Sequence, residues 1–192
     1  MDLFALSWQN LLFAGLTALW LLEFRLFPST EERGSGAGSR SFRRILFSIL
    51  AVIVLVAVSY FLDFGWIRGP ARAYFQFLGL AVYATGLVLR YWCSYLLGQN
   101  FTRGVIADRD QELVSVGPYR ELRHPLYLGL LLLTLGVPLF LGNVAGVVAA
   151  SILMPMALAN RIAIEERELL ETLGERYATW MKGRYRMIPY IY

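Results

Sequence analysis

Apolar and polar segments alternate along this chain in long blocks. Five apolar stretches can be recognised, at 3–22, 45–62, 74–89, 126–141 and 144–159. A helix needs roughly 20 apolar residues to cross the hydrocarbon of a bilayer. The last two stretches are shorter and are joined only by Gly142 and Asn143, which predicts a tight helical hairpin. The pattern therefore predicts an all-α, polytopic transmembrane bundle of about five helices.

The polar residues gather in three segments, at 23–44, 98–125 and 160–192. In the last of these, apolar residues recur at spacings of three, four or seven, namely at Ile162, Leu169, Leu173, Tyr177 and Trp180. This spacing predicts an amphipathic helix that continues from the fifth span and ends before Pro189.

Composition and charge agree with a membrane protein. Hydrophobic residues make up 57% of the chain and charged residues 17%, which excludes a typical soluble domain. With the N-terminus outside, every Lys and Arg except Arg68 and Arg72 would lie on the cytoplasmic side. Membrane insertion and an anionic inner leaflet account for the net charge of +4, so we expect membrane lipids and no nucleic acid as partners.

We divide the chain into two parts, 1–89 with three spans and 90–192 as the functional core. The first part contains a glycine- and serine-rich linker at 28–43, where "GSGAG" lies between two spans and not between a strand and a helix. We therefore interpret it as a flexible linker and not as a dinucleotide loop. Such linkers in a short chain without a targeting signal lead us to expect a prokaryotic inner membrane, with the active site and C-terminus cytoplasmic.

The stretch "GPYRELRHPLYLG" at 117–129 holds the chain's single histidine, His124. Pro125 has no backbone N–H and suits the first turn of a helix, so the fourth span should begin at about His124. A helix N-terminus beside an imidazole, flanked by Tyr119 and Tyr127, suits a ligand that carries a carboxylate and a delocalised cation. Alternatively, His124 is an interfacial capping residue within an aromatic belt.

Charged residues occur near the hydrocarbon at two positions in the sequence. Arg161 and Glu165 are four residues apart on one helix face, where charges cost free energy unless they are paired or functional. Arg90 lies inside the third apolar run. We favour a side chain that snorkels to the interface over one that lines a lateral entrance for a lipid tail.

Three elements together carry a family resemblance: "LGQNF" (97–101), "LVSVGPYRELRHPLYLG" (113–129), and "RIAIEERELLETLGERYATW" (161–180) with "RMIP" (186–189). They resemble the isoprenylcysteine carboxyl methyltransferase family, integral-membrane enzymes related to phospholipid methyltransferases. The specific feature is His-Pro-x-Tyr-x-Gly followed about forty residues later by Arg-x-x-x-Glu-Glu-x-x-Leu. The resemblance covers roughly 88–190 and does not include the first two spans.

The resemblance implies S-adenosylmethionine as cofactor, with S-adenosylhomocysteine as its product. The pocket would be cytoplasmic, covered by the C-terminal helix and open sideways to the membrane. Glu165 is implied as a catalytic cofactor ligand and Arg161 as the catalytic residue that orients the substrate, with Arg90 a second substrate-binding candidate. The implied cofactor-binding residues are Gln111, Glu112, Leu113, Val114, Tyr119, His124, Pro125, Leu126, Tyr127 and Glu165. The family more often has a histidine near Gln111 or Glu112, which leaves the side-chain roles there open, and no metal site is predicted.

The function implied is carboxyl O-methylation of an isoprenylcysteine-like acceptor that enters from the bilayer. A carboxylate needs no general base, and Arg161 could bind it through two hydrogen bonds. A lipid amine would need Glu165, Glu166 or His124 as base. Phospholipid N-methylation and thiol S-methylation therefore remain alternatives, as does a non-catalytic membrane sensor or scaffold.

Overall fold

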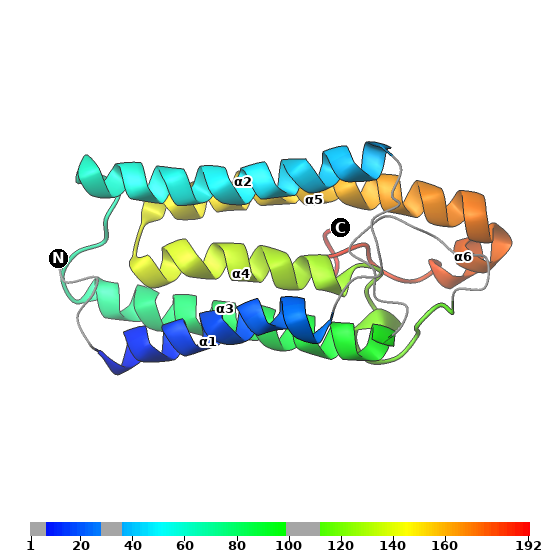
Figure 1. Cartoon of the computed structure of the whole chain (residues 1–192), viewed down its shortest axis with the longest axis horizontal. Helices are drawn as coiled ribbons and strands as arrows, with labels where there is room; N and C mark the ends of the chain where they lie inside the picture. Colours follow the sequence, from blue (N-terminus) through cyan, green and yellow to red (C-terminus); the bar gives the residue numbers. More distant parts are fainter. Residues whose placement is uncertain (1–6, 28–35, 99–111) are drawn as a thin grey trace.

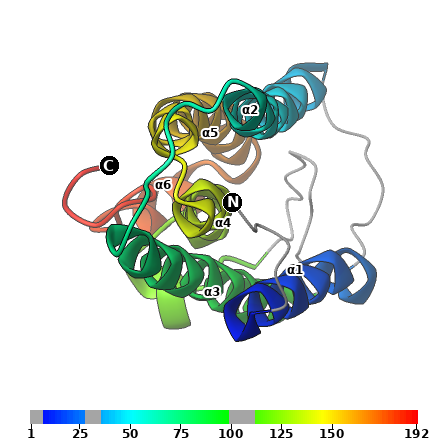
Figure 2. The same cartoon turned by 90° about the vertical axis from the view of Figure 1, so that its left-hand side faces the viewer.

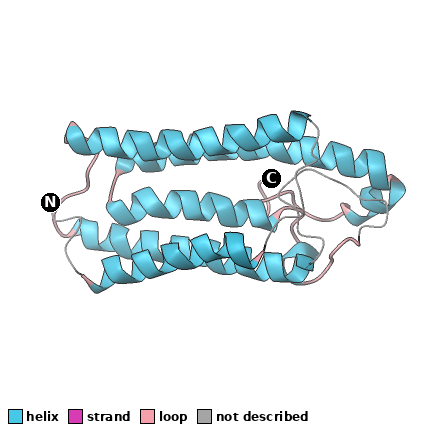
Figure 3. Ribbon diagram, viewed as in Figure 1, coloured by secondary structure: helices cyan, strands magenta, loops and turns pink. Residues whose placement is uncertain are grey.

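Five long helices run side by side in the computed structural model, which describes residues 7–27, 36–98 and 112–192 (Figure 1). Across these residues the regular elements are all helical (Figure 3). They are α1 (Trp8–Leu26), α2 (Gly36–Phe61), α3 (Ala71–Leu97), the 3-10 helix η2 (Gly117–Arg120), α4 (Pro125–Leu141), α5 (Val144–Leu173) and α6 (Glu175–Trp180). The predicted all-α bundle is confirmed.

Helix α4 lies at the centre of the bundle (Figure 2). It packs against α3 on one side and α5 on the other, while α1 packs on α3 and α2 on α5. Glycines allow the close approach of α3 and α4, because a Cβ atom on Gly136 would lie 2.8 Å from the backbone nitrogen of Tyr83. Small residues at helix contacts are typical of membrane bundles.

The chain is an integral membrane protein. Helices α3 and α5 and the Arg40–Phe61 part of α2 are long and apolar enough to cross a bilayer, and α4 is a shorter apolar helix. Large apolar side chains on α2, such as Phe47 and Leu50, are exposed on the bundle surface, where lipid would cover them. All five expected helices form, and three of them meet the length and hydropathy of a span. Their orientation in the membrane stays a prediction.

The predicted hairpin of α4 and α5 is confirmed. Gly142 ends α4 in the left-handed conformation, with φ of +71°, and the fully buried Asn143 caps α5. The Asn143 side chain accepts a hydrogen bond from Gly146 N (2.7 Å) and donates one to Ser59 Oγ (2.6 Å). This satisfies polar groups at the tip that would otherwise be buried without partners.

Two predicted boundaries can be compared with the helices. The linker predicted for 28–43 is shorter, because α2 already begins at Gly36; residues 28–35 lie outside the described residues. A helix extends readily from an apolar segment that is already helical, since propagation costs much less than nucleation. The proposed division between 89 and 90 falls within α3 and stays a prediction.

The prediction of one continuous C-terminal helix is wrong. Helix α5 ends at Leu173, Gly174 takes φ of +54°, and the short α6 follows in a new direction. Glycine adopts this left-handed conformation without the steric cost of a side chain. After α6 the chain returns to the start of α4, where Arg123 N donates to Tyr185 O (2.8 Å) and His124 N to Arg186 O (2.9 Å). The break thus brings the C-terminal segment against the predicted site.

Candidate active site

Arg161, Tyr127 and Glu165 meet at the cytoplasmic end that we predict for the bundle. The Tyr127 hydroxyl donates to Glu165 Oε2 (2.6 Å) and accepts from Arg161 Nε (3.1 Å). Arg161 Nη1 also donates to Ser41 Oγ of α2 (3.0 Å). Arg161 is only 3% exposed, whereas the Glu165 side chain is 28% exposed. The predicted face of α5 therefore holds one buried cation and one partly accessible carboxylate against the first turn of α4.

His124 precedes α4 as predicted and is its N-cap residue, but its side chain makes no capping hydrogen bond. The interpretation of His124 as an interfacial residue within an aromatic belt stays a prediction. The ring packs on Tyr127 with 5.6 Å between the ring centroids, and the residue is 5% exposed. His124 Nδ1 lies 3.9 Å from Glu165 Oε1 and Nε2 lies 3.5 Å from Glu166 Oε1, and Nε2 forms no hydrogen bond within the described part of the chain.

Glu166 forms an ionic cluster that the sequence did not reveal. Arg123 Nη1 donates to its Oε1 (2.9 Å) and Arg186 Nε to its Oε2 (3.0 Å). The Glu166 side chain is 5% exposed, and hydrogen bonds to an ionised carboxylate are stronger than neutral ones. Arg123 Nε also donates to Arg184 O (2.9 Å). One carboxylate thus ties α5 to the segment before α4 and to the C-terminal segment.

Tyr119 lies in η2 and is 5% exposed. Removal from water raises the pKa of its hydroxyl well above the usual value, with Cys93 and Glu165 as further causes. Its carbonyl accepts from Arg184 Nε (3.0 Å), and that guanidinium lies 4.6 Å from the centre of the Trp180 ring. Tyr119 is therefore held neutral and fixed near Glu165 by the turn that follows α6.

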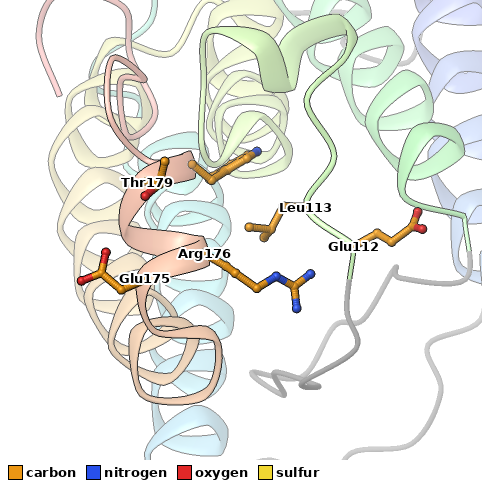
Figure 4. Close-up of a pocket in the computed structure, with 6 residues that line it drawn as sticks. Glu112, Leu113, Glu175, Arg176 and Thr179 are labelled. Carbon is orange, nitrogen blue, oxygen red and sulfur yellow. The ribbon is translucent and has the colours of Figure 1, made fainter.

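The stretch 112–114 contacts α6. Trp180 Nε1 donates to Val114 O (3.2 Å) and to Ser115 Oγ (2.9 Å). An open depression of about 720 Å³ lies beside this contact. Figure 4 shows Arg176 extending from α6 toward the irregular segment that carries Leu113. The depression is lined by Glu112, Leu113, Glu175, Arg176, Thr179 and Trp180.

The predicted cofactor-binding residues thus form two groups. One surrounds the start of α4: Tyr119, His124, Pro125, Leu126, Tyr127 and Glu165. The other comprises Glu112, Leu113 and Val114 beside α6. Gln111 lies outside the described residues. Tyr177 lies between the groups. Its ring stacks on Trp180 (5.6 Å between centroids), and burial, followed by the charges of Glu166 and Glu165, raises the pKa of its hydroxyl.

Arg90 does not snorkel, so that interpretation is wrong. The residue is 9% exposed and donates from Nε to Glu23 Oε2 (2.8 Å) and from Nη2 to Glu23 Oε1 (2.5 Å). Its Nη1 approaches Leu126 O (3.4 Å), so the backbone of Leu126 contacts Arg90. A charge inside the bundle is tolerated when it is paired in this way. A role for Arg90 in substrate binding stays a prediction.

The residues fit the implied cofactor in their polar chemistry. His124 Nε2 and Tyr177 Oη are buried and have no hydrogen-bond partner in the described part of the chain. Buried polar atoms are nearly always bonded, so each orphaned atom calls for an explanation such as a ligand. The accessible edge of Glu165 would complement a cation, and the neighbouring aromatic rings would favour a sulfonium and a nucleobase.

Comparison with known proteins agrees with the family resemblance found in the sequence. Residues 77–171 match the model of the isoprenylcysteine carboxyl methyltransferase family. The chain is 33% identical over 116 residues to a protein-S-isoprenylcysteine O-methyltransferase of Tribolium castaneum, covering 59% of this chain and 41% of that protein. It is 30% identical over 119 residues to the protein of that name from Schizosaccharomyces pombe, covering 61% and 50%. The chain therefore spans about half the length of these relatives.

The fold also matches a solved structure. That structure is of the eukaryotic intramembrane Ras methyltransferase ICMT, and the TM-score is 0.69 at 22% sequence identity. The alignment covers 98% of this chain and 70% of that one. The likeness therefore includes α1 and α2, which lie outside the matched residues 77–171.

Proposed function

This chain belongs to the isoprenylcysteine carboxyl methyltransferase family, and from that premise we propose that it is an S-adenosylmethionine-dependent membrane methyltransferase. Its acceptor would be a lipophilic carboxylate, of the isoprenylcysteine type, presented from the bilayer. The observation that carries the proposal is the buried guanidinium of Arg161, bonded to Tyr127 beside the accessible carboxylate of Glu165.

Arg161 is suited to an anionic acceptor. A guanidinium can bind a carboxylate through two parallel hydrogen bonds, and the attraction is strong where water is excluded. Tyr127 and Ser41 both contact Arg161, which limits the rotation of its side chain. The chain would thus contribute orientation and exclusion of water, which are the main requirements of a displacement between two bound reactants.

The cofactor would be held by Glu165, Tyr119, His124 and Tyr127 at the start of α4, and by 112–114 beside α6. When bound, it supplies an electrophilic methyl group on a positively charged sulfur. Glu165 would attract that charge, and the aromatic side chains would keep the site dry. We expect Arg161 to contact the acceptor and not the cofactor.

An amine acceptor is the second candidate. An amine loses a proton when it is methylated, so this reaction needs a group that accepts the proton. Glu166 is poorly suited to this role, since both of its oxygens accept hydrogen bonds from arginines. His124 is better suited, because its Nε2 is buried without a hydrogen-bond partner among the described residues. This observation keeps phospholipid N-methylation in consideration, beside thiol S-methylation.

A labelling experiment tests the proposal. The purified protein in lipid nanodiscs would receive methyl-labelled S-adenosylmethionine with N-acetyl-S-farnesylcysteine, phosphatidylethanolamine or a small alkyl thiol. A methyl ester releases labelled methanol in alkali, whereas N-methyl and S-methyl products do not. We expect alkali-labile label with the farnesylcysteine. Stable label on the lipid would favour the amine alternative, and no transfer to any of the three would contradict the proposed acceptor classes.

Cofactor binding can be tested separately by titrating S-adenosylhomocysteine calorimetrically. Glu165→Ala should abolish saturable binding, while Glu171→Ala, at an exposed position on the same helix, should not. A folded wild-type protein that does not bind the probe would instead favour the sensor or scaffold alternative.

A further inference from the structure

We infer that Ser41 is a positioning residue for Arg161, and thus that α2 takes part in acceptor recognition. The inference rests on the proposed function. Ser41 lies on α2, outside the residues 77–171 that carry the family match. Its hydroxyl nevertheless accepts a hydrogen bond from Arg161 Nη1 at 3.0 Å. No feature of the sequence near Ser41 had indicated a role in the site.

The burial of both partners makes this contact important. Ser41 is fully buried and Arg161 is 3% exposed. A buried guanidinium must find protein acceptors for its N–H groups, since water cannot supply them. Hydrogen bonds to charged groups are also stronger than those between neutral groups. Loss of the Ser41 hydroxyl would therefore change the surroundings of a group that cannot simply turn to solvent.

Hydrogen bonds to Tyr127 and Ser41 help to fix the plane of the Arg161 guanidinium. Nε donates to Tyr127 of α4 and Nη1 donates to Ser41 of α2, so two different atoms of the group are held by two different helices. Bidentate binding of a carboxylate depends on the direction of this plane. Loss of the Ser41 contact would leave the direction of this plane less well defined, and a misplaced binding group lowers the rate of a displacement.

The position of Ser41 is itself fixed by packing. Ile45, one turn later on α2, belongs to the same buried cluster as Leu158 and Ile162 of α5. Arg44 Nη1 donates to Asn160 Oδ1 (2.8 Å), which adds a polar contact between the two helices. Ser41 is thus held against the turn of α5 that carries Arg161.

The test compares Ser41→Ala, Ser41→Thr and Ser48→Ala. Ser48 lies on the same helix and bonds only to the carbonyl of Arg44 among the described residues, so it is a matched control. For methylation of N-acetyl-S-farnesylcysteine we expect kcat/KM to fall about tenfold in Ser41→Ala, the size of one charged hydrogen bond. Ser41→Thr should recover most of the loss, and Ser48→Ala should equal wild type. The affinity for S-adenosylhomocysteine should not change in any of them, and the unfolding temperature should fall only in Ser41→Ala, because a buried guanidinium loses an acceptor there.

A double-mutant cycle with Arg161→Ala makes the test specific. If Ser41 acts through Arg161, its replacement should have no further effect once Arg161 is absent. Additive losses would overturn the inference, as would an unchanged kcat/KM in Ser41→Ala. A parallel loss of S-adenosylhomocysteine affinity and of thermal stability would overturn it too, because Ser41 would then be structural. A wild-type protein that transfers no methyl group would instead overturn the proposed function, and this inference with it.

Discussion

Among the described residues, two buried ionic groups differ in what they connect. Glu23 and Arg90 form an ion pair between two membrane helices, α1 and α3. Glu166 is bonded by Arg123 and Arg186, which belong to the segment before α4 and to the C-terminal segment. The first group joins elements that are already rigid, whereas the second holds two irregular segments beside His124. The difference indicates that the Glu23–Arg90 pair stabilises the helix bundle, and that the Glu166 cluster holds the segments around His124 in place.

Their exposure supports this distinction. The Glu23 side chain is fully buried and that of Arg90 is 11% exposed, so neither can be hydrated if its partner is removed. In the cluster, the Arg186 side chain is 42% exposed and can turn to water. Loss of one partner should therefore mainly destabilise the protein in the first case, and mainly loosen the site in the second.

Glu23→Gln should have the largest effect on stability. It leaves the buried guanidinium of Arg90 without its counter-charge, which costs about 3–5 kcal/mol in known buried pairs. We expect a lower unfolding temperature in detergent and a poor yield. The double replacement Glu23→Gln with Arg90→Met should recover most of the stability. If it recovers stability but not methyl transfer, the predicted role of Arg90 in substrate binding gains support, and full recovery of both would exclude that role.

Glu166→Gln should lower cofactor affinity more than stability. The amide keeps the shape but loses the charge that attracts Arg123 and Arg186, and each charged hydrogen bond contributes about 1.5–3 kcal/mol. We expect affinity for S-adenosylhomocysteine to fall on the order of tenfold, measured calorimetrically. Proteolysis should then release the C-terminal segment sooner than in wild type.

Glu171→Gln is the matched control for this change, since Glu171 lies at an exposed position on the same helix. A Glu166 variant with normal affinity but a strongly reduced unfolding temperature would reverse the assignment, since the cluster would then serve the bundle like the Glu23–Arg90 pair.

Trp180→Phe should have a smaller effect, confined to the region beside α6. The ring can still stack on Tyr177 and Arg184, but the donor to Val114 O and Ser115 Oγ is lost. A net loss of about 1 kcal/mol is typical for such a hydrogen bond. We expect affinity for S-adenosylhomocysteine to fall severalfold, with unchanged KM for the acceptor. A change in the acceptor KM alone would indicate that the depression in Figure 4 binds the acceptor and not the cofactor.

Local signals in the sequence predicted much of this molecule. The apolar runs gave the helices, Pro125 marked the start of α4, and the four-residue spacing of Arg161 and Glu165 predicted that both lie on one helix face. These features depend on residues close in sequence. Their assigned roles in catalysis and cofactor binding stay predictions.

The features that were missed depend on contacts between distant elements. Glu23 and Arg90 are separated by 67 positions, and Ser41 and Arg161 by 120. Nothing in one sequence links such partners, because either residue is locally compatible with a solvated position. The break at Gly174 did have a local signal, the glycine itself, but the apolar periodicity continues across it and favoured one helix.

Of these replacements, Asp63→Asn should have the smallest effect on the unfolding temperature. Asp63 and Arg68 form an exposed ion pair, with nitrogen and oxygen 2.5 Å apart and side chains that are 71% and 63% exposed. Arg68 lowers the pKa of the Asp63 carboxyl by hydrogen bonding and by charge. A lowered pKa stabilises the fold only above the unfolded-state value, and the contribution disappears as the pH falls through the folded-state value.

Water and salt screen such a pair, so we expect no measurable change in unfolding temperature at neutral pH. Asparagine is the right replacement because Asp63 has φ of +52°, a left-handed conformation that asparagine tolerates. The measurement is thermal unfolding of wild type and variant at low and high salt. A clear loss that vanishes at high salt would mean that exposed charges also stabilise the bundle, and burial would then no longer explain why Glu23 matters more.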